Sequence, residues 1–112
     1  MSRKPINYNS VPKTIELFGR TIKVSDETGD ISHKAYGEAR YGCNQIALSS
    51  KAGGSEITDE EYKLTFIHEM LHFILNFTGF EAILRQNSSI DLEQFIELIA
   101  SGIYQYEKSA KY

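Results

Sequence analysis

Two histidines and a glutamate at a fixed spacing are the residues of this sequence best suited to chemistry. They lie in the run His68-Glu69-Met70-Leu71-His72, which has the pattern H-E-x-x-H. Residues four apart lie on one face of a helix, so both imidazoles can reach the same point in space. Zn²⁺ accepts such imidazoles as two of its tetrahedral ligands. Glu69 is offset by one residue, so it is better placed to touch a metal-bound water, as a general base does.

The alternative interpretation is that His68 and His72 are ordinary core histidines or lie on a solvated face. Two of the three histidines of the chain, however, stand at ligand spacing with a glutamate between them. The surrounding sequence is apolar, and a charged glutamate is costly to bury there without a partner. We therefore favour a metal site.

The motif requires a helix, and its flanks predict one over about residues 59–78. The run T-D-E-E that begins at Thr58 is typical of a capping box, in which Glu61 reaches back toward the start of the helix. Its acidic residues also place negative charge at the positive end of the helix dipole. Gly79 is expected to end the helix in a left-handed conformation. Because the segment is apolar over most of its circumference, we expect a central, largely buried helix.

A second helix is predicted to begin near Ser89 or Asp91, either of which can cap it. Apolar residues then recur at spacings of three and four and form one stripe. The stripe consists of Leu92, Phe95, Ile96, Ile99, Ile103 and Tyr106. The polar tail, residues 107–112, is expected to fray.

Catalytic zinc usually has a third protein ligand, and the second helix offers Asp91, Glu93 and Glu97. On a helical wheel, Glu93 lies roughly 100° from the centre of the apolar stripe and Glu97 roughly 140°. Glu93 thus borders the buried face beside Ala100, whereas Glu97 points more toward water. We favour Glu93 as the ligand and keep Glu97 as the alternative. The remaining interpretation is that both are solvated surface charges.

The residues before the motif helix predict a small sheet. Residues 13–18 and 21–24 alternate polar and apolar around a glycine, which predicts a β-hairpin. Its buried face would consist of Ile15, Leu17, Ile22 and Val24. Two further strands are expected over 35–41 and 45–49, around a Gly/Asn turn.

The connecting segments are expected to be less regular. Residues 1–12 read as a polar, extended lead-in, residues 25–34 as a loop and residues 51–55 as a flexible loop. A short helical piece is expected around residues 81–85.

The strand over Gln45–Ser49, which ends shortly before the motif helix, is a candidate for partner binding. An exposed sheet edge beside a cleft can hold an extended peptide as an added strand. The other interpretation, equally open, is that this edge simply closes the sheet.

Length, charge and cysteine content limit the classes of protein to which this sequence can belong. The 112 residues are enough for one domain with one modest core, so we expect a single domain over 1–112. The net charge of −3 argues against a dedicated nucleic-acid binder. We expect no membrane partner, because no stretch approaches the roughly 20 apolar residues of a membrane span. Cys43 is the only cysteine. A free thiol, together with a basic N-terminus that no apolar run follows, predicts a reducing, cytoplasmic setting.

With these features together, the sequence resembles the glutamate-type zincins, since Glu93 follows His72 by 21 residues on a second predicted helix. More narrowly, it resembles the minimal, single-domain zincin-like metallopeptidases of phages and mobile elements, related to the ImmA/IrrE type. The matching features are the strand pair before the motif, the capped motif helix, the H-F-I-L continuation at His72 and the run around Glu93. The resemblance covers roughly residues 13–106.

The resemblance implies zinc at His68, His72 and Glu93, with Glu69 as the base. It implies an α+β fold in which a small antiparallel sheet of hairpins packs on an active-site helix and a C-terminal helix. The implied function is that of a zinc-dependent metallopeptidase, which hydrolyses a peptide or protein substrate through a zinc-bound water activated by Glu69.

The chain departs from larger peptidases in two ways. It offers no obvious second lobe to form the far wall of a cleft. It also offers no clear oxyanion donor, although Tyr104 and His33 are candidates. The alternative function is therefore a zincin-fold binding or regulatory module with little or no catalytic activity. A purely structural zinc is a third possibility, but such sites tend to use cysteine, and only Cys43 is present.

Overall fold

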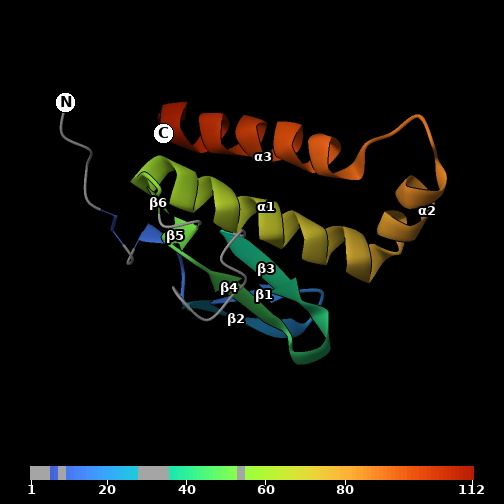
Figure 1. Ribbon diagram of the computed structural model, residues 1–112, viewed down its shortest axis with the longest axis horizontal. Helices are drawn as coiled ribbons and strands as arrows, with labels where there is room; N and C mark the ends of the chain where they lie inside the picture. The colour runs from blue at the N-terminus through green and yellow to red at the C-terminus, as the bar shows by residue number, and fades with distance from the viewer. Residues whose placement is uncertain (1–5, 8–9, 28–35, 53–54) are drawn as a thin grey trace.

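The long motif helix is the central layer of the molecule. The structure is a computed structural model, which describes residues 6–7, 10–27, 36–52 and 55–112. Helix α1 (Asp59–Thr78) has helix α3 (Leu92–Ser109) on one side and a four-stranded sheet on the other (Figure 1). A shorter helix, α2 (Phe80–Gln86), joins the two long helices. The α+β class expected from the sequence is confirmed.

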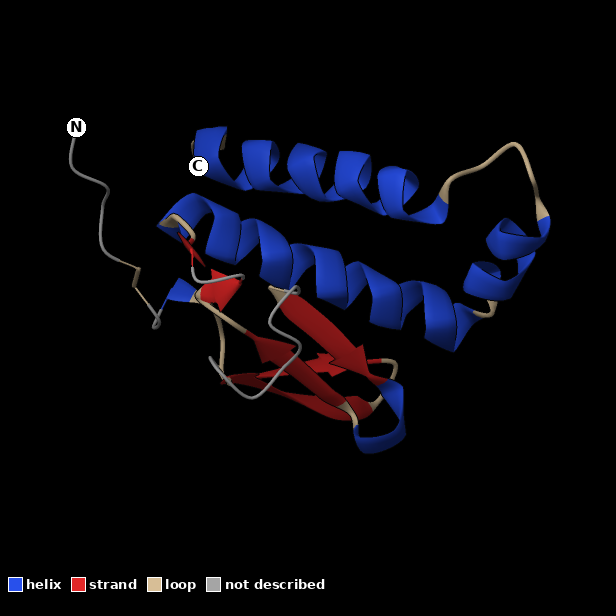
Figure 2. Cartoon of the chain, in the orientation of Figure 1, coloured by secondary structure: helices blue, strands red, loops and turns tan. Residues whose placement is uncertain are grey.

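The sheet has the strand order β1-β2-β4-β3 (Figure 2). Its strands are β1 (Thr14–Leu17), β2 (Arg20–Asp26), β3 (Gly37–Arg40) and β4 (Gln45–Leu48). The two expected hairpins, β1–β2 and β3–β4, are both present and antiparallel. A one-turn 3₁₀ helix, η2 (Tyr41–Cys43), and the left-handed Asn44 (φ 51°) form the turn of the second hairpin.

The expectation of an antiparallel sheet holds for each hairpin but not for their junction, because β2 and β4 run parallel. The second hairpin docks through β4, whose Ile46, Ala47 and Leu48 are all 0 % exposed. In this position both edges of the apolar strand are paired and α1 packs against it, so its side chains are removed from water.

This topology corrects the expected position of the free edge. Gln45–Ser49 does not lie at an edge, because β4 is hydrogen-bonded to β2 on one side and to β3 on the other. Among the described residues, the edge strands of the sheet are β1 and β3. Of these two, β3 is the strand that packs against α1.

Both ends of α1 follow the sequence prediction. The side-chain oxygen of Thr58 accepts a hydrogen bond from the Glu61 backbone N–H at 3.1 Å, and Glu61 reaches back to the Thr58 N–H, which completes the capping box. Gly79 ends the helix with φ 81°, a left-handed conformation that glycine adopts without strain. Asp91 caps α3 by accepting from the Gln94 N–H at 3.1 Å.

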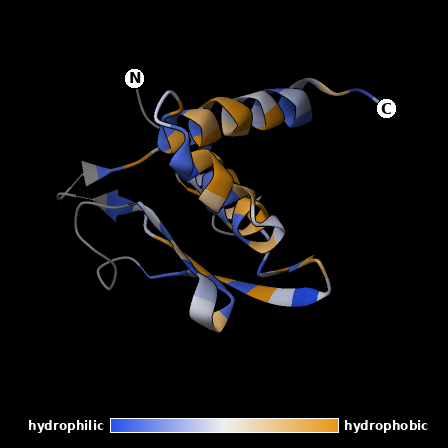
Figure 3. Ribbon diagram, turned by 90° about the vertical axis from the view of Figure 1, so that its right-hand side faces the viewer, coloured by the Kyte–Doolittle hydropathy of each residue, from blue (hydrophilic) through white to orange (hydrophobic). Residues whose placement is uncertain are grey.

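The core lies between the sheet and α1 and continues between α1 and α3. Ile22, Ile46 and Leu48 of the sheet and Phe73 of α1 are 0 % exposed, and Ile96 of α3 is equally buried. Figure 3 shows apolar stretches on both long helices and on the strands. No helix within the described residues has the length and apolar character needed to cross a membrane.

Several connecting segments differ from expectation. Residues 51–55, expected as a flexible loop, contribute to a small hairpin of β5 (Lys51–Ala52) and β6 (Ser55–Glu56). Strand β2 continues through Asp26, into the expected loop, and α3 continues to Ser109, into the expected frayed tail. The segment expected as a polar lead-in, residues 1–12, also contributes to the core, because Val11 is part of the hydrophobic cluster. The rest of the loop expected over 25–34 lies largely outside the described residues.

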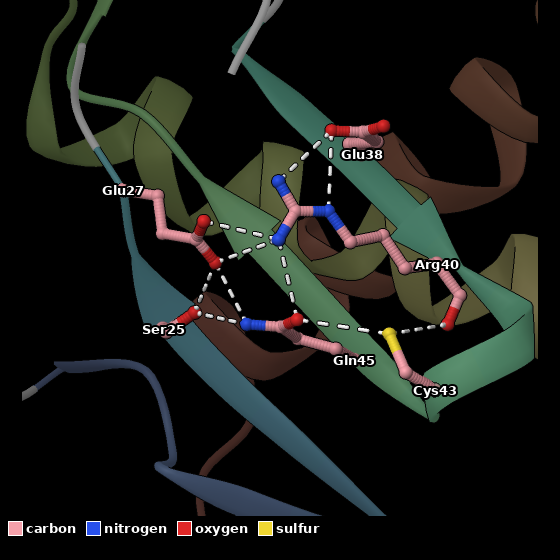
Figure 4. Close-up of polar contacts among 6 residues, drawn as sticks. All are labelled: Ser25, Glu27, Glu38, Arg40, Cys43 and Gln45. Carbon is pink, nitrogen blue, oxygen red and sulfur yellow. Dashed lines mark hydrogen bonds and ion pairs between the residues drawn. The ribbon is translucent and has the colours of Figure 1, made fainter. Parts of the chain in front are cut away.

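A polar network on the sheet fixes the edge strand β3 (Figure 4). Arg40 of β3 reaches across β4 and donates to both carboxylate oxygens of Glu27, at 3.0 and 2.9 Å. Gln45 of β4 donates to the same carboxylate at 2.7 Å. Hydrogen bonds from Ser25 and Arg40 hold the pKa of Glu27 below its usual range. The network therefore ties β3 to the end of β2 and sets its position beside α1.

Candidate metal centre

The structure brings three of the expected residues together. Ring nitrogens of His68 and His72 and a carboxylate oxygen of Glu93 all lie within 4.8 Å of one another. The two histidines come from neighbouring turns of α1, and Glu93 comes from the first turn of α3. Nε2 of His68 lies 3.0 Å from one carboxylate oxygen of Glu93, and Nε2 of His72 lies 3.2 Å from the other. Both imidazoles thus turn the same nitrogen toward one carboxylate.

These distances fit a tetrahedral zinc site. Zn–N and Zn–O bonds of about 2.0–2.1 Å at tetrahedral angles place neighbouring ligand atoms about 3.3 Å apart. The observed separations of 3.0 and 3.2 Å are close to that value. Two imidazoles and one carboxylate are also the donor set of many catalytic zinc sites. The two distances end on different oxygens of Glu93, and the ligand atoms as a set lie within 4.8 Å of one another, so the three side chains could close around an ion after the His68–Glu93 hydrogen bond is replaced.

Glu97, the alternative third ligand, lies against the opposite side of His68. Its Oε1 is 2.8 Å from Nδ1 of His68, not from Nε2. The direction of approach does not make a hydrogen bond, so Nδ1 of His68 has a close ionic neighbour without a hydrogen-bonded partner. Because Glu93 faces the Nε2 atoms of both histidines and Glu97 faces neither, the geometry favours Glu93 as the ligand. Asp91, the third acidic candidate, caps the helix.

Both glutamates reach α1 because the buried face of α3 is turned from the expected stripe. Leu92, Ile96 and Ala100 are buried, whereas Ile99 is 37 % exposed and Tyr106 60 % exposed. At about 100° per residue, this moves the centre of the buried face by about 40° toward the glutamate side. The small side chain of Ala100 lets the two helices approach there.

Glu69 lies on the side of α1 that faces β3. Only 8 % of the residue is exposed, so the expected general base is buried beside the two histidines. Burial raises the pKa of Glu69 to about 7. The positive charge of His68 acts in the opposite direction, and the negative charges of Glu93 and Glu38 add to the rise. A carboxyl group with such a pKa can both accept and return a proton near neutral pH.

Gly37, the first residue of β3, lies directly over Glu69. A Cβ atom at this position would lie 2.6 Å from Cγ2 of Thr65 and 3.0 Å from Cγ of Glu69. The first contact is too short for a Cβ atom unless the Thr65 side chain moves, and the second would require Glu69 to give way slightly. The backbone of the edge strand therefore runs in contact with the expected base.

Glu81 of α2 is a residue of this site that sequence reasoning missed. Its Oε1 lies 3.8 Å from Nδ1 of His72, and the residue is only 7 % exposed. Burial alone would raise the pKa of Glu81, but hydrogen bonds from Arg85, Asn76 and Tyr41 outweigh it and hold the pKa below its usual range. The sequence did contain a feature that could have pointed to Glu81. It is followed four positions later by Arg85, in a helical segment directly after the motif helix.

Tyr104, one of the expected oxyanion donors, lies away from the candidate ligands. It lines a cavity of about 480 Å³ formed by α1, the end of α3 and the residues before β1, whose lining residues include Ile15 and Met70. None of the residues that line this cavity is a candidate ligand. His33, the other candidate donor, lies outside the described residues.

A smaller recess adjoins the metal centre. It has a volume of about 210 Å³ and lies between α1, α3 and the start of β3. Its walls consist of Tyr36, Glu61, Leu64, Thr65, Glu97 and Ala100. One of these residues, Glu97, also contacts Nδ1 of His68, so the recess lies near the candidate ligands.

Comparison of the chain with protein-family models, with curated proteins and with solved structures gave no match.

Proposed function

We propose that this protein is a small zinc-dependent metallopeptidase. The observation that carries the proposal is the convergence of two imidazole Nε2 atoms on the carboxylate of Glu93, at 3.0 and 3.2 Å, beside a buried glutamate on the same helix. His68, His72 and Glu93 would hold the metal, and Glu69 would act as the base. We also propose a reducing, cytoplasmic setting, which the exposed free thiol of Cys43 supports.

The chemistry divides between the metal and the protein. Zinc, when bound, would supply a Lewis acid for the scissile carbonyl and would lower the pKa of water toward ~7. A carboxylate oxygen of Glu69 would accept the proton of the attacking water and deliver it to the nitrogen of the leaving amine. Burial of Glu69 supports this role, because its pKa of about 7 suits proton transfer in both directions.

The substrate would be an extended peptide that adds to β3. This strand is at an edge of the sheet, and its first residue, Gly37, contacts Glu69. A peptide paired with the free side of β3 would gain main-chain hydrogen bonds while passing close to the base. The recess of about 210 Å³ beside His68 could receive one of its side chains.

A second candidate function is a binding or regulatory module built on the same scaffold. The observation that favours it is the position of Tyr104, which lines a cavity apart from the candidate ligands. Without an oxyanion donor, a zincin site loses a large part of its transition-state stabilisation. In this alternative, β3 would bind a partner segment and no bond would be cleaved.

The test compares wild-type protein with Glu69→Gln and His72→Ala. Zinc content is measured by mass spectrometry, and hydrolysis is measured on a diverse peptide mixture. We expect about one zinc per chain in wild type and in Glu69→Gln, loss of zinc in His72→Ala, and turnover in wild type alone. The loss of the general base should lower the rate by about 10²- to 10⁴-fold.

Two other outcomes would count against the proposed enzyme. Full activity of Glu69→Gln would exclude the proposed mechanism. Stoichiometric zinc in wild type with no hydrolysis of any peptide in the mixture would favour the binding module.

A further inference from the structure

We propose that Glu81 is a positioning residue that holds the imidazole of His72 in the orientation needed for metal binding. The proposal rests on the proposed zinc site, and it adds α2 to the elements that build that site. The two ring nitrogens of His72 face different carboxylates.

The two sides of the His72 ring have separate partners. Nε2 faces Oε1 of Glu93 at 3.2 Å, and Nδ1 faces Oε1 of Glu81 at 3.8 Å. If Nε2 binds the metal, Nδ1 must carry the proton, and a carboxylate near that N–H fixes the tautomer and the ring plane. A small movement of either side chain would bring the Glu81 contact within hydrogen-bond distance.

Glu81 is held firmly enough to do this. Its Oε2 accepts a hydrogen bond from the hydroxyl of Tyr41 at 3.2 Å, and its Oε1 accepts from Arg85 at 2.9 Å. The donors come from η2 and from α2 itself, so the carboxylate is fixed from two directions. Its side chain is 10 % exposed, as is that of His72, so the contact between the two side chains is largely shielded from water.

The contrast with Glu97 is the reason to assign this role to Glu81. Glu97 faces Nδ1 of His68 at 2.8 Å, but its side chain is 68 % exposed. An exposed glutamate on a long side chain has many competing conformations and a water shell. The buried carboxylate of Glu81 has few, so its removal should have the larger effect on the metal.

The test is the zinc affinity of Glu81→Gln, measured by competition with a chromophoric chelator. Loss of an outer carboxylate typically costs 10–100-fold in metal affinity, and we expect a loss of about this size. Glu107→Gln removes the same charge from the exposed far end of α3, and we expect its affinity to equal that of wild type. The absorption spectrum of bound Co²⁺ should change in Glu81→Gln but not in Glu107→Gln.

Tyr41→Phe separates positioning from a structural role. It removes a hydrogen bond from Glu81 but leaves the carboxylate beside His72. If Glu81 acts only by anchoring α2, Tyr41→Phe and Glu81→Gln should lower stability and zinc affinity in parallel. We expect instead that Tyr41→Phe lowers stability and retains zinc affinity within about threefold, because the charge near Nδ1 remains.

A measurement on wild-type protein keeps the proposal testable if Glu81→Gln does not fold. Long-range ¹H–¹⁵N correlation spectra of the zinc-loaded protein report which nitrogen of each histidine carries the proton. We expect the proton of His72 on Nδ1. Coordination through Nδ1 would overturn the proposal, as would wild-type zinc affinity in a folded Glu81→Gln variant. If wild-type protein binds no zinc at all, the proposed function itself fails.

Discussion

Glu69 lies in contact with Gly37, where the helix that carries the motif packs against the sheet. Because a Cβ atom at Gly37 would lie 3.0 Å from Cγ of Glu69, the strand covers the carboxylate side chain and keeps water from it. This explains why burial is the largest influence on the pKa of Glu69. Burial by this contact raises the pKa of Glu69 into the range that suits a base. The same burial should therefore lower the stability of the folded protein when Glu69 is ionised.

The first prediction at this scale concerns Glu69→Gln and pH. The pKa of Glu69 in the folded protein is about 7, above its ordinary value of 4.5. Its contribution to stability is therefore complete below about pH 4.5 and is lost as pH rises through about 7. In the absence of metal, Glu69→Gln should be more stable than wild type at pH 8 by about 3 kcal/mol.

Urea denaturation with a chelator present, at pH 5 and at pH 8, measures this difference. At pH 5 the difference should shrink to about 1 kcal/mol, because the folded carboxyl group is protonated there and pH 5 lies only slightly above its ordinary pKa of 4.5. An equal difference at both pH values would mean that the substitution acts through packing and not through charge.

At the scale of elements, a capping box holds the first turn of α1. Its first turn contains Asp59, Glu60 and Glu61, and Thr58 satisfies the backbone N–H of Glu61. The histidines lie in the middle of the helix, about ten residues farther along. Fraying at the start should therefore reduce stability without reaching the candidate ligands.

We predict that Thr58→Ala lowers the free energy of unfolding by about 1 kcal/mol. Thr58→Ser is the matched control, because it retains the hydroxyl that accepts from Glu61 and should lose much less. Chemical denaturation measures both, and zinc affinity should be the same in the two variants. Equal losses of stability in both would show that the threonine methyl group, not the cap, is responsible.

At the scale of the whole molecule, the candidate ligands join two elements that are far apart in the sequence. His68 and His72 belong to α1, and Glu93 belongs to α3, so a bound ion would link the helical layers. The unfolded chain does not hold the three side chains together. Binding should therefore stabilise the fold by mass action.

We predict that zinc at 100 times its dissociation constant raises the free energy of unfolding of wild type by about 2.7 kcal/mol. Denaturation with and without zinc measures the gain. His72→Ala removes a ligand from α1 and should abolish the gain, whereas a gain that survives in this variant would place the ion elsewhere.

The sequence determined the features that depend on neighbouring residues. The limits and caps of α1, the two hairpins and the start of α3 follow from turn residues, capping residues and hydrophobic periodicity, which act within a few positions. The spacing of His68, Glu69 and His72 belongs to the same class, because one helix fixes their relation. A helical wheel could identify Glu93 as a candidate ligand, because Glu93 lies in the first turn of α3.

Only the tertiary structure decided the relations between elements. The sequence contains no local signal that β4 pairs with β2, which places Gln45–Ser49 in the interior of the sheet and leaves β1 and β3 as the edge strands among the described residues. It also contains none for the rotation of α3, which exposes Ile99 and brings Glu97 to Nδ1 of His68. The contact between Glu81 and His72 likewise depends on the angle between α1 and α2, for which the sequence contains no local signal. These relations are set by which apolar surfaces bury the most area against one another, a sum over the whole molecule that no short segment records.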